Sequence, residues 1–429
     1  MFKKMKTGLK KGPNCVRRSN PMNSKKTLAN IKVLELSQFV AGPYCASMLA
    51  HLGADVIKVE RPQTGDQLRH VGPFLHDEQH LEKSGMFLYL NRNKSGITLN
   101  YRTEKGRDLL SKLLREMDIL IDDLAPSQRA EVGLNFDDLH KLNPRLIVTT
   151  ITPFGQTGPY KDFKARDLNI QAISGLTAIN GDPDNEPLRI PGMQSHFQSA
   201  LNAAIGTLAA LFYREISGRG QFVDISEMEC TASILGDVMS NASMLNQVRK
   251  RSQALSGAEA LGMVWPIGNF QTSDGYVNAC LLESHQWKGL LEVFGNPEWG
   301  ADPSLADMFS PKDHVDTSRI VKNIKESMSR FDKETLFREA QKYRVPLVSI
   351  KNTAEVLASP QLRECEFFEE MEHPIAGKLT YPGAPFKMSV TPWQTVTPAP
   401  LLGQHNALVY GKLGITQQQQ DQLLSEHVI

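Results

Sequence analysis

The stretch from Ile31 to Pro62 constrains the fold most, because it reads as a strand, a helix and a second strand in close succession. Apolar residues stand at positions 31, 33, 34 and 36, and Gly42-Pro43 then breaks this pattern. Proline suits the first turn of a helix, since its missing N–H would have no partner there. After Gly53, residues 55–60 form the second expected strand, with apolar side chains at 56, 57 and 59. Two strands joined by a helix predict a parallel pair, whose ligands bind at the carboxyl ends of the strands.

The same alternation continues along the first half of the chain. Further strands are expected at 97–99, 118–122 and 146–151, and helices at 103–116 and 136–142. Residues 194–217 form the clearest long helix, which carries little charge and is expected to be buried on most of its sides. Strands that alternate with helices predict an α/β fold with a doubly wound parallel sheet.

The composition changes beyond residue 225, which suggests a second domain. Residues 269–271 and 276–278 flank a Ser-Asp-Gly turn and predict an antiparallel pair. We therefore expect a small α+β domain with its linkers at 226–335. Because an apolar strand pattern returns at 345–350, we expect residues 336–429 to rejoin the large domain begun at 29–225.

The first 28 residues are rich in lysine and arginine, and no acid precedes Glu35. They predict a disordered basic tail or a translation start at Met22. A targeting peptide is the alternative, although Gly12-Pro13 interrupts the amphipathic helix that such a peptide needs. Five isolated cysteines suit free thiols in the cytoplasm. A net charge of +1 and the lack of a long apolar run argue against nucleic-acid and membrane partners.

The usual nucleotide and metal signatures are missing from the sequence. No G-x-G-x-x-G follows the first strand, and the phosphate-binding loop G-x-x-x-x-G-K-[ST] does not occur. H-E-x-x-H and C-x-x-C are absent too, so no metal site is predicted. Arg61 stands at the carboxyl end of the second strand, where a cation would meet a phosphate.

Several long motifs, in order over residues 31–429, resemble the class III CoA-transferases. This family includes formyl-CoA transferase, carnitine CoA-transferase and the related α-methylacyl-CoA racemases. The matching segments are LSQFVAGP, LGADVIKVERP, YLNRNKSGITLN, LNPRLIVTTITPFGQTGPY, ARDLNIQAISGLTAINGDPD, GTLAALFYREISGRGQFVDIS, YRVPLVSIKNTAEVLASPQL and PAPLLGQHN.

The resemblance implies a fold, a ligand and a reaction. Such proteins have a Rossmann-like large domain formed by both chain ends, an inserted small domain, and two chains interlocked as a dimer. Coenzyme A or acyl-CoA is a substrate rather than a tightly bound cofactor, and a carboxylic acid is the second substrate. In the typical transferase an aspartate attacks the thioester and passes CoA on through a mixed anhydride.

The resemblance also implies which residues contact CoA. These positions are Val40, Ala41, Arg61, Leu90, Asn91, Asn93, Lys94, Asp123 and Lys164. Two positions depart from the family, since Asp123 replaces an asparagine and Glu131 replaces an arginine. Each puts an anion beside a polyanionic ligand and is expected to weaken CoA binding. Arg129 is a candidate to compensate.

The largest departure concerns the nucleophile. Counting back from GTLAALFYRE, the family's catalytic aspartate falls on His196. A neutral imidazole can act as a base or accept an acyl group transiently, but it cannot form the anhydride. The alternative is a histidine that merely fills a vacated site. Asp167 is the nearest other carboxylate, and Arg166 replaces the histidine base of the racemases.

Two functions stay open from the sequence. One is CoA transfer between an acyl-CoA and a carboxylic acid at an altered site. The other is a catalytically silent subunit that supports an active paralogue in a heterodimer, which the substitution at His196 favours. A homodimer and a heterodimer are both compatible with the motifs. A nicotinamide-dependent oxidoreductase would need the missing glycine fingerprint.

Overall fold

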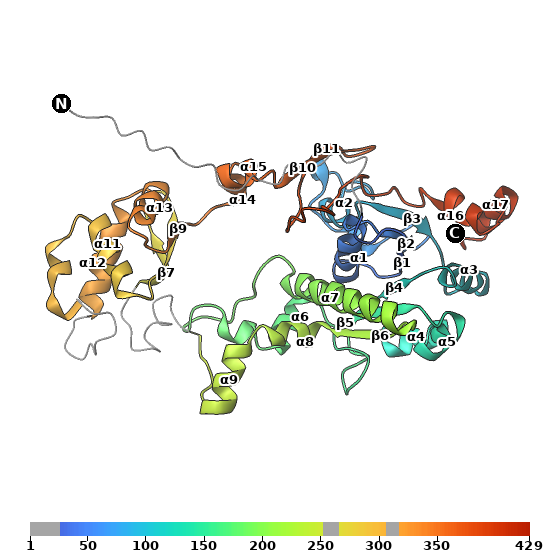
Figure 1. The fold of residues 1–429 in the computed structure, drawn as a ribbon, viewed down its shortest axis with the longest axis horizontal. Helices are drawn as coiled ribbons and strands as arrows, with labels where there is room; N and C mark the ends of the chain where they lie inside the picture. The colour runs from blue at the N-terminus through green and yellow to red at the C-terminus, as the bar shows by residue number, and fades with distance from the viewer. Residues whose placement is uncertain (1–25, 252–265, 306–316) are drawn as a thin grey trace. The chain divides into compact units, whose positions relative to one another are not determined.

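The computed structural model describes residues 26–251, 266–305 and 317–429 (Figure 1). The chain forms two compact units. The first comprises residues up to 174, 191–235 and 366–429, and the second comprises 175–190 and 236–365. The predicted domain limits at 225 and 335 therefore differ from the limits of these units and stay predictions. All but three residues of the predicted tail lie outside the described part of the chain.

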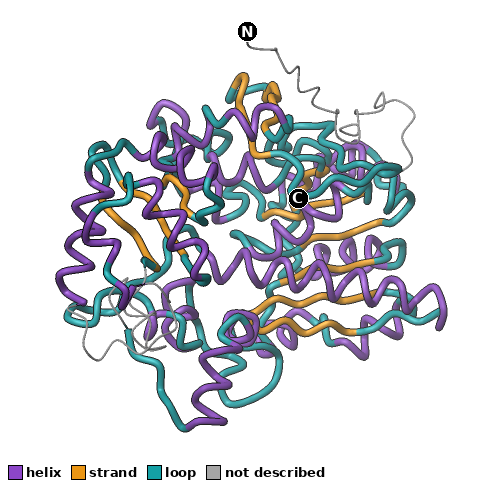
Figure 2. The backbone as a smooth tube through the Cα atoms, turned by 60° about the vertical axis from the view of Figure 1, so that its left-hand side comes forward, coloured by secondary structure: helices purple, strands orange, loops and turns teal. Residues whose placement is uncertain are grey.

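A six-stranded parallel sheet forms the centre of the first unit, which confirms the predicted α/β fold (Figures 1 and 2). Its strand order is β3-β2-β1-β4-β5-β6. The strands are β1 (Lys32–Glu35), β2 (Asp55–Glu60), β3 (Lys94–Thr98), β4 (Ile119–Asp122), β5 (Ile147–Thr152) and β6 (Phe222–Ser226). β1 lies between β2 and β4, and its Val33 is in register with Val56 of β2 and Ile119 of β4.

Two apolar cores cover the two faces of this sheet. Successive residues of β1 point to opposite faces, so Val33 joins one core and Leu34 the other. Helices α1 (Ala41–His51) and α7 (Gln194–Ser217) supply the first core, and α3 (Glu104–Leu114), α16 (Asn406–Lys412) and α17 (Gln417–Ser425) supply the second. The end of the chain thus returns to the first unit, where the Tyr410 hydroxyl donates to the Thr98 carbonyl over 2.7 Å.

The remaining elements of the first unit are short. They are α2 (Gly85–Leu90), α4 (Pro126–Val132), α5 (Phe136–Leu142), α6 (Asp167–Ile173), α8 (Glu227–Ser233) and the antiparallel hairpin β10 (Phe368–His373) and β11 (Gly377–Pro382).

Two local expectations were wrong. β3 begins at residue 94, three residues before the predicted strand at 97–99, because the turn is confined to residues 91–93. Asn93 ends this turn with a φ of 62°, and its side chain binds the backbone of residues 394–397. Helix α7 has the predicted bounds, but one side of it is exposed along Leu201, Ile205, Phe212 and Ile216.

The second unit contains an antiparallel sheet in the order β7-β8-β9. The predicted pair is confirmed as β7 (Ile267–Gln271) and β8 (Tyr276–Cys280). β9 (Leu347–Ser349) pairs with β8. The strand at 345–350 therefore belongs to this unit, whereas we had expected it in the large domain. Its helices are α9 (Gly236–Leu245), α11 (Ser284–Val293), α12 (Thr317–Ser329), α13 (Lys333–Lys342), α14 (Thr353–Leu357) and α15 (Pro360–Glu364).

Candidate active site

A set of fully buried charges lies behind the loop that follows β1. We call Glu35, Lys58, Asp66 and Lys94 the buried ion network. The Lys58 ammonium lies 2.8 Å from Glu35 Oε1 and 2.7 Å from Asp66 Oδ2, and the Lys94 ammonium lies 2.7 Å from Glu35 Oε2. Lys58 also donates to the Ser37 carbonyl, and Asp66 Oδ1 accepts from the Phe39 N–H. The network thereby fixes the loop at 37–40.

A histidine and a glutamate meet beside this loop. His196 comes from the first turn of α7, and Glu227 is the first residue of α8, directly after β6. His196 Nδ1 lies 2.7 Å from Glu227 Oε1, and both side chains are more than nine-tenths buried. The Phe39 ring meets the imidazole edge-on, with ring centroids 5.5 Å apart. Among the described residues, neither His196 Nε2 nor Glu227 Oε2 has a hydrogen-bond partner.

Asp167 holds the beginning of α7. Its Oδ1 accepts from the Ser195 N–H at 3.0 Å and from the Ser195 hydroxyl at 2.7 Å. Its Oδ2 accepts from the Gln171 amide at 2.8 Å. Because both oxygens are engaged and the side chain is buried, this geometry suits positioning of α7 better than nucleophilic attack. The catalytic role predicted for Asp167 stays a prediction.

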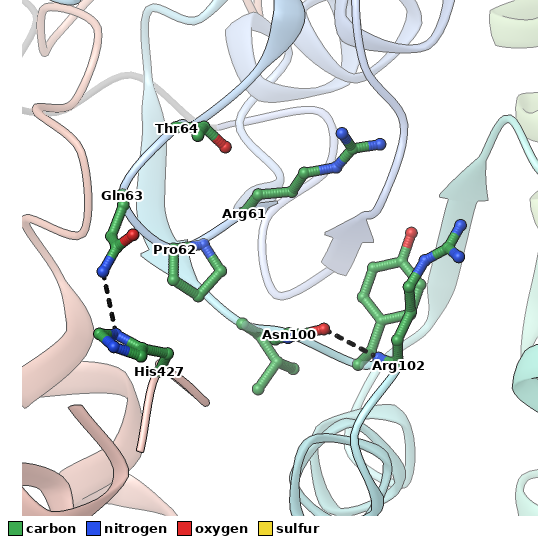
Figure 3. Close-up of a pocket in the computed structure, with 9 residues that line it drawn as sticks. Arg61, Pro62, Gln63, Thr64, Asn100, Arg102 and His427 are labelled. Atoms are coloured by element: carbon green, nitrogen blue, oxygen red, sulfur yellow. Dashed lines mark hydrogen bonds between the residues drawn. The ribbon is translucent and has the colours of Figure 1, made fainter. Parts of the chain in front are cut away.

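A cavity of about 340 Å³ opens beside the carboxyl ends of β2 and β3 (Figure 3). Arg61 and Arg102 contribute two exposed guanidinium groups to its lining. The other lining residues are Pro62, Gln63, Thr64, Leu99, Asn100, Tyr101 and His427, with Gln63 hydrogen-bonded to His427 over 2.9 Å. The predicted ligand residue Arg61 thus borders a space that could accept a phosphate group.

Asp123 lies between this edge of the sheet and the loop at 37–40. Its Oδ2 accepts from the Gln38 N–H at 3.0 Å. Burial, with a smaller effect from the neighbouring carboxylates of Asp122 and Asp66, raises the pKa of Asp123 to about 7. Asp123 is therefore only partly ionised near neutral pH, which reduces the repulsion expected between this residue and CoA.

Arg129 does not compensate for the anions, contrary to the possibility raised by the sequence. It is buried, with Nη2 at 2.5 Å from both Asp122 Oδ1 and Thr150 Oγ1. Glu131 is exposed, and its carboxylate lies 3.5 Å from the Arg102 guanidinium. One of the two cations at the cavity is thus shared with the carboxylate of Glu131.

The other predicted CoA contacts differ in accessibility. Val40 and Ala41 are buried at the start of α1, and Leu90 is fully buried. Asn91 and Lys94 bind each other, and Lys94 also donates to Glu35 and to the Pro43 carbonyl.

The Lys94 ammonium therefore has all three donors engaged within the protein, so it has no free donor for a phosphate of CoA. Lys164 is exposed between β5 and α6. CoA contacts through these segments stay predictions.

Glu227 and Phe39 were not among the residues predicted for the site. A signal for Glu227 existed, because it directly follows the last strand of a parallel sheet, where ligands bind. No comparable signal marks Phe39, whose position depends on a backbone φ of 69°. Within residues 26–251, 266–305 and 317–429, no three histidine, cysteine or acidic side chains gather to hold a metal, and no helix is long and apolar enough to cross a membrane.

Comparisons with known proteins agree with this fold. The family described as CoA-transferase family III matches residues 28–406. Formyl-CoA:oxalate CoA-transferases of Shigella boydii and Escherichia coli are 29% identical over 420 residues, which span 94% of this chain and 99% of theirs.

Solved structures agree as well. A CAIB/BAIF family protein from Brucella suis is 28% identical with a TM-score of 0.80, over 90% of this chain and 99% of that one. Rv3272 from Mycobacterium tuberculosis, at 24% identity, shares the fold over the same fractions with a TM-score of 0.76. The family match covers most of the sequence, and the chain therefore belongs to CoA-transferase family III.

Proposed function

We propose that the protein transfers CoA from an acyl-CoA to a carboxylic acid. The observation that carries the proposal is the cavity at the carboxyl ends of β2 and β3, with the guanidinium groups of Arg61 and Arg102 in its lining. Arginine binds phosphate through paired, charge-assisted hydrogen bonds, and the nucleotide part of CoA carries several phosphate oxygens. The formyl-CoA:oxalate CoA-transferases among the relatives support the same substrate class.

The replacement of the family's aspartate by His196 calls for a different chemical route. The incoming carboxylate attacks the thioester carbonyl itself, which forms a mixed anhydride and releases the CoA thiolate. The thiolate then attacks the other carbonyl of the anhydride, which yields the new acyl-CoA and the free donor acid. No covalent bond to the protein forms in either step. Both substrates must then be held together, so ternary-complex kinetics are expected.

A second candidate is a silent subunit that supports an active paralogue. The lack of a carboxylate at position 196 favours it. The exposed apolar stripe of α7, formed by Leu201, Ile205, Phe212 and Ile216, suits burial against a partner chain in either case. An interlocked dimer, of two identical or two related chains, is part of both proposals.

The test follows CoA transfer by mass spectrometry. The purified protein is incubated with acetyl-CoA, hexanoyl-CoA or benzoyl-CoA and a panel of carbon-13-labelled carboxylic acids, and labelled acyl-CoA is measured. Transfer by the protein alone, without a covalent adduct at His196 or Asp167, is the expected result. Arg61→Ala should reduce transfer, while the control Arg115→Ala, an exposed arginine outside the cavity, should not.

Two other results are informative. CoA binding without transfer favours the silent subunit, and transfer should then appear when a paralogue with a carboxylate at the position of His196 is added. Failure to bind CoA contradicts both proposals.

A further inference from the structure

The hydrogen bond between His196 and Glu227 fixes where the imidazole carries its proton. Nδ1 faces a carboxylate oxygen at 2.7 Å, so in the neutral imidazole the single N–H is on Nδ1. Nε2 then presents a lone pair, and it has no partner among the described residues. A buried polar atom without a partner costs free energy, which makes the unused Nε2 a feature that needs an explanation.

A lone pair of this kind can act as a general base, and acyl acceptors differ in whether they need one. A carboxylate that attacks a thioester has no proton to lose, so a general base gives it no help. Water must lose a proton as it attacks, and a positioned base typically accelerates that step by roughly 10²- to 10⁴-fold. An imidazole at the position of the family's nucleophile therefore favours water as the acceptor over a carboxylate.

Two other nucleophiles nearby are unsuitable. The Ser195 hydroxyl donates to Asp167 and not to His196, so the imidazole is not paired with a serine. Cys230 lies close to Glu227, and its pKa is raised to about 11 by burial and by the carboxylates of Glu227 and Glu229, which keeps the thiol protonated. Neither protein nucleophile is thus available to this base, which leaves water as the group that it can activate.

We propose that His196, oriented by Glu227, is a general base that hydrolyses acyl-CoA, in addition to any CoA transfer. Water attacks the thioester carbonyl, and its proton passes to Nε2. The C–S bond then breaks, and the imidazolium returns the proton to the leaving thiolate, which gives a carboxylic acid and CoA. The amino end of α7, a helix of 24 residues, adds a positive potential that favours the charge on the carbonyl oxygen. The proposal rests on the proposed function in one respect, that a CoA thioester reaches this end of α7.

Neighbouring groups keep the pair in place. Asp167 fixes the first turn of α7 through the N–H and hydroxyl of Ser195. The buried ion network fixes the backbone of Phe39, whose ring covers one edge of the imidazole. Glu227 does not touch the reacting atoms and acts as a positioning residue.

The experiment measures release of the CoA thiol from acetyl-CoA, hexanoyl-CoA and benzoyl-CoA without any acceptor acid, in water enriched in oxygen-18. We expect release above the buffer rate, with one oxygen-18 in the acid product. His196→Gln should lower kcat by roughly 10²-fold or more, and Glu227→Gln by roughly 10-fold with little change in KM. The control Glu229→Gln, an exposed glutamate of the same helix, should keep the wild-type rate.

Chemical rescue separates a catalytic from a structural role. Added imidazole should restore thiol release to His196→Ala, which a merely structural histidine would not allow. The proposal is overturned if the wild type releases thiol no faster than buffer, if His196→Gln keeps the wild-type rate, or if the acyl group is trapped covalently on His196. Transfer to a labelled acid and CoA binding are measured separately, so hydrolysis can fail while the transferase proposal stands.

Discussion

Two groups of buried charges lie on either side of the loop at 37–40, and they differ in how completely they are paired. In the buried ion network, each ammonium of Lys58 and Lys94 lies within 2.8 Å of a carboxylate oxygen. In the pair of His196 and Glu227, one hydrogen bond is made, and one polar atom of each side chain has no hydrogen-bond partner among the described residues.

The difference indicates two purposes for buried charge. In fully paired groups, the attraction between the charges offsets the cost of their desolvation, and the contacts hold the backbone in one conformation. An unpaired buried atom can still form a hydrogen bond with a reactant. Fully paired and partly unpaired buried charges both occur beside the loop at 37–40. The network therefore holds the loop beside the site in place, and the histidine–glutamate pair has the unpaired atoms on which the proposed hydrolysis rests.

The largest effect should come from breaking the network. Lys58→Met leaves two buried carboxylates short of a partner and should lower the free energy of unfolding by about 3–5 kcal/mol, measured by urea denaturation. Lys141→Met is the matched control, because Lys141 is 78% exposed and its ion pair with Asp138 should contribute under about 0.5 kcal/mol. Equal losses in the two variants would show that the network does not stabilise the loop.

A smaller effect should come from Asp123, which approaches the same loop from the other side. Its pKa is about 7 when folded and near its usual 3.8 when unfolded, so the folded protein binds more protons between these values. Stability should therefore fall as the pH rises from about 4 to about 7.

Asp123→Asn should remove that fall and stabilise the protein at pH 8 by roughly 2 kcal/mol, about half the full linkage value because part of the residue reaches the surface. Thermal unfolding across this pH range is the measurement. An unchanged pH profile in the variant would mean that another group is responsible.

Loss of a cavity cation should be smaller again. Arg61→Ala should weaken CoA binding about 10-fold, or roughly 1.4 kcal/mol, in calorimetric titration, since one charge-assisted contact is lost. Stability should not change, because Arg61 is exposed. A loss of stability without a loss of CoA affinity would show that Arg61 has a structural role and does not bind the ligand.

The smallest effect tests the paired part of the site. Ser195→Ala removes one hydrogen bond to Asp167 while the backbone N–H of residue 195 still donates to the same oxygen. We expect a loss of about 1 kcal/mol in stability by urea denaturation. A loss above about 3 kcal/mol would show that this hydrogen bond stabilises the protein as strongly as the buried ion network does.

Much of the fold was predictable because local patterns and tertiary contacts agree. β2 and α7 have the predicted bounds, since each has a regular pattern of apolar residues and a glycine near one end. β3 and β9 were misjudged because long-range contacts decide them: Asn93 binds residues about 300 positions away, and β9 pairs with β8 rather than with the large sheet.

The site was predictable only where a motif indicates it. Counting back from GTLAALFYRE led to His196, but no sequence spacing reveals that Glu227 is its partner, because the two residues come from different helices. The charges of Glu35 and Lys58 are likewise buried in strands that read as apolar, and only the sheet register brings them together. Side-chain partners across elements are a tertiary property.

The return of the chain's end to β3 has a consequence for synthesis. Tyr410 binds Thr98, 312 residues earlier, and the intervening chain contains the second unit. At about 5–20 residues per second, roughly 15–60 s of translation separate the two partners. During that time β3 lacks its contact with α16, so the first unit is completed only after α16 and α17 have been synthesised.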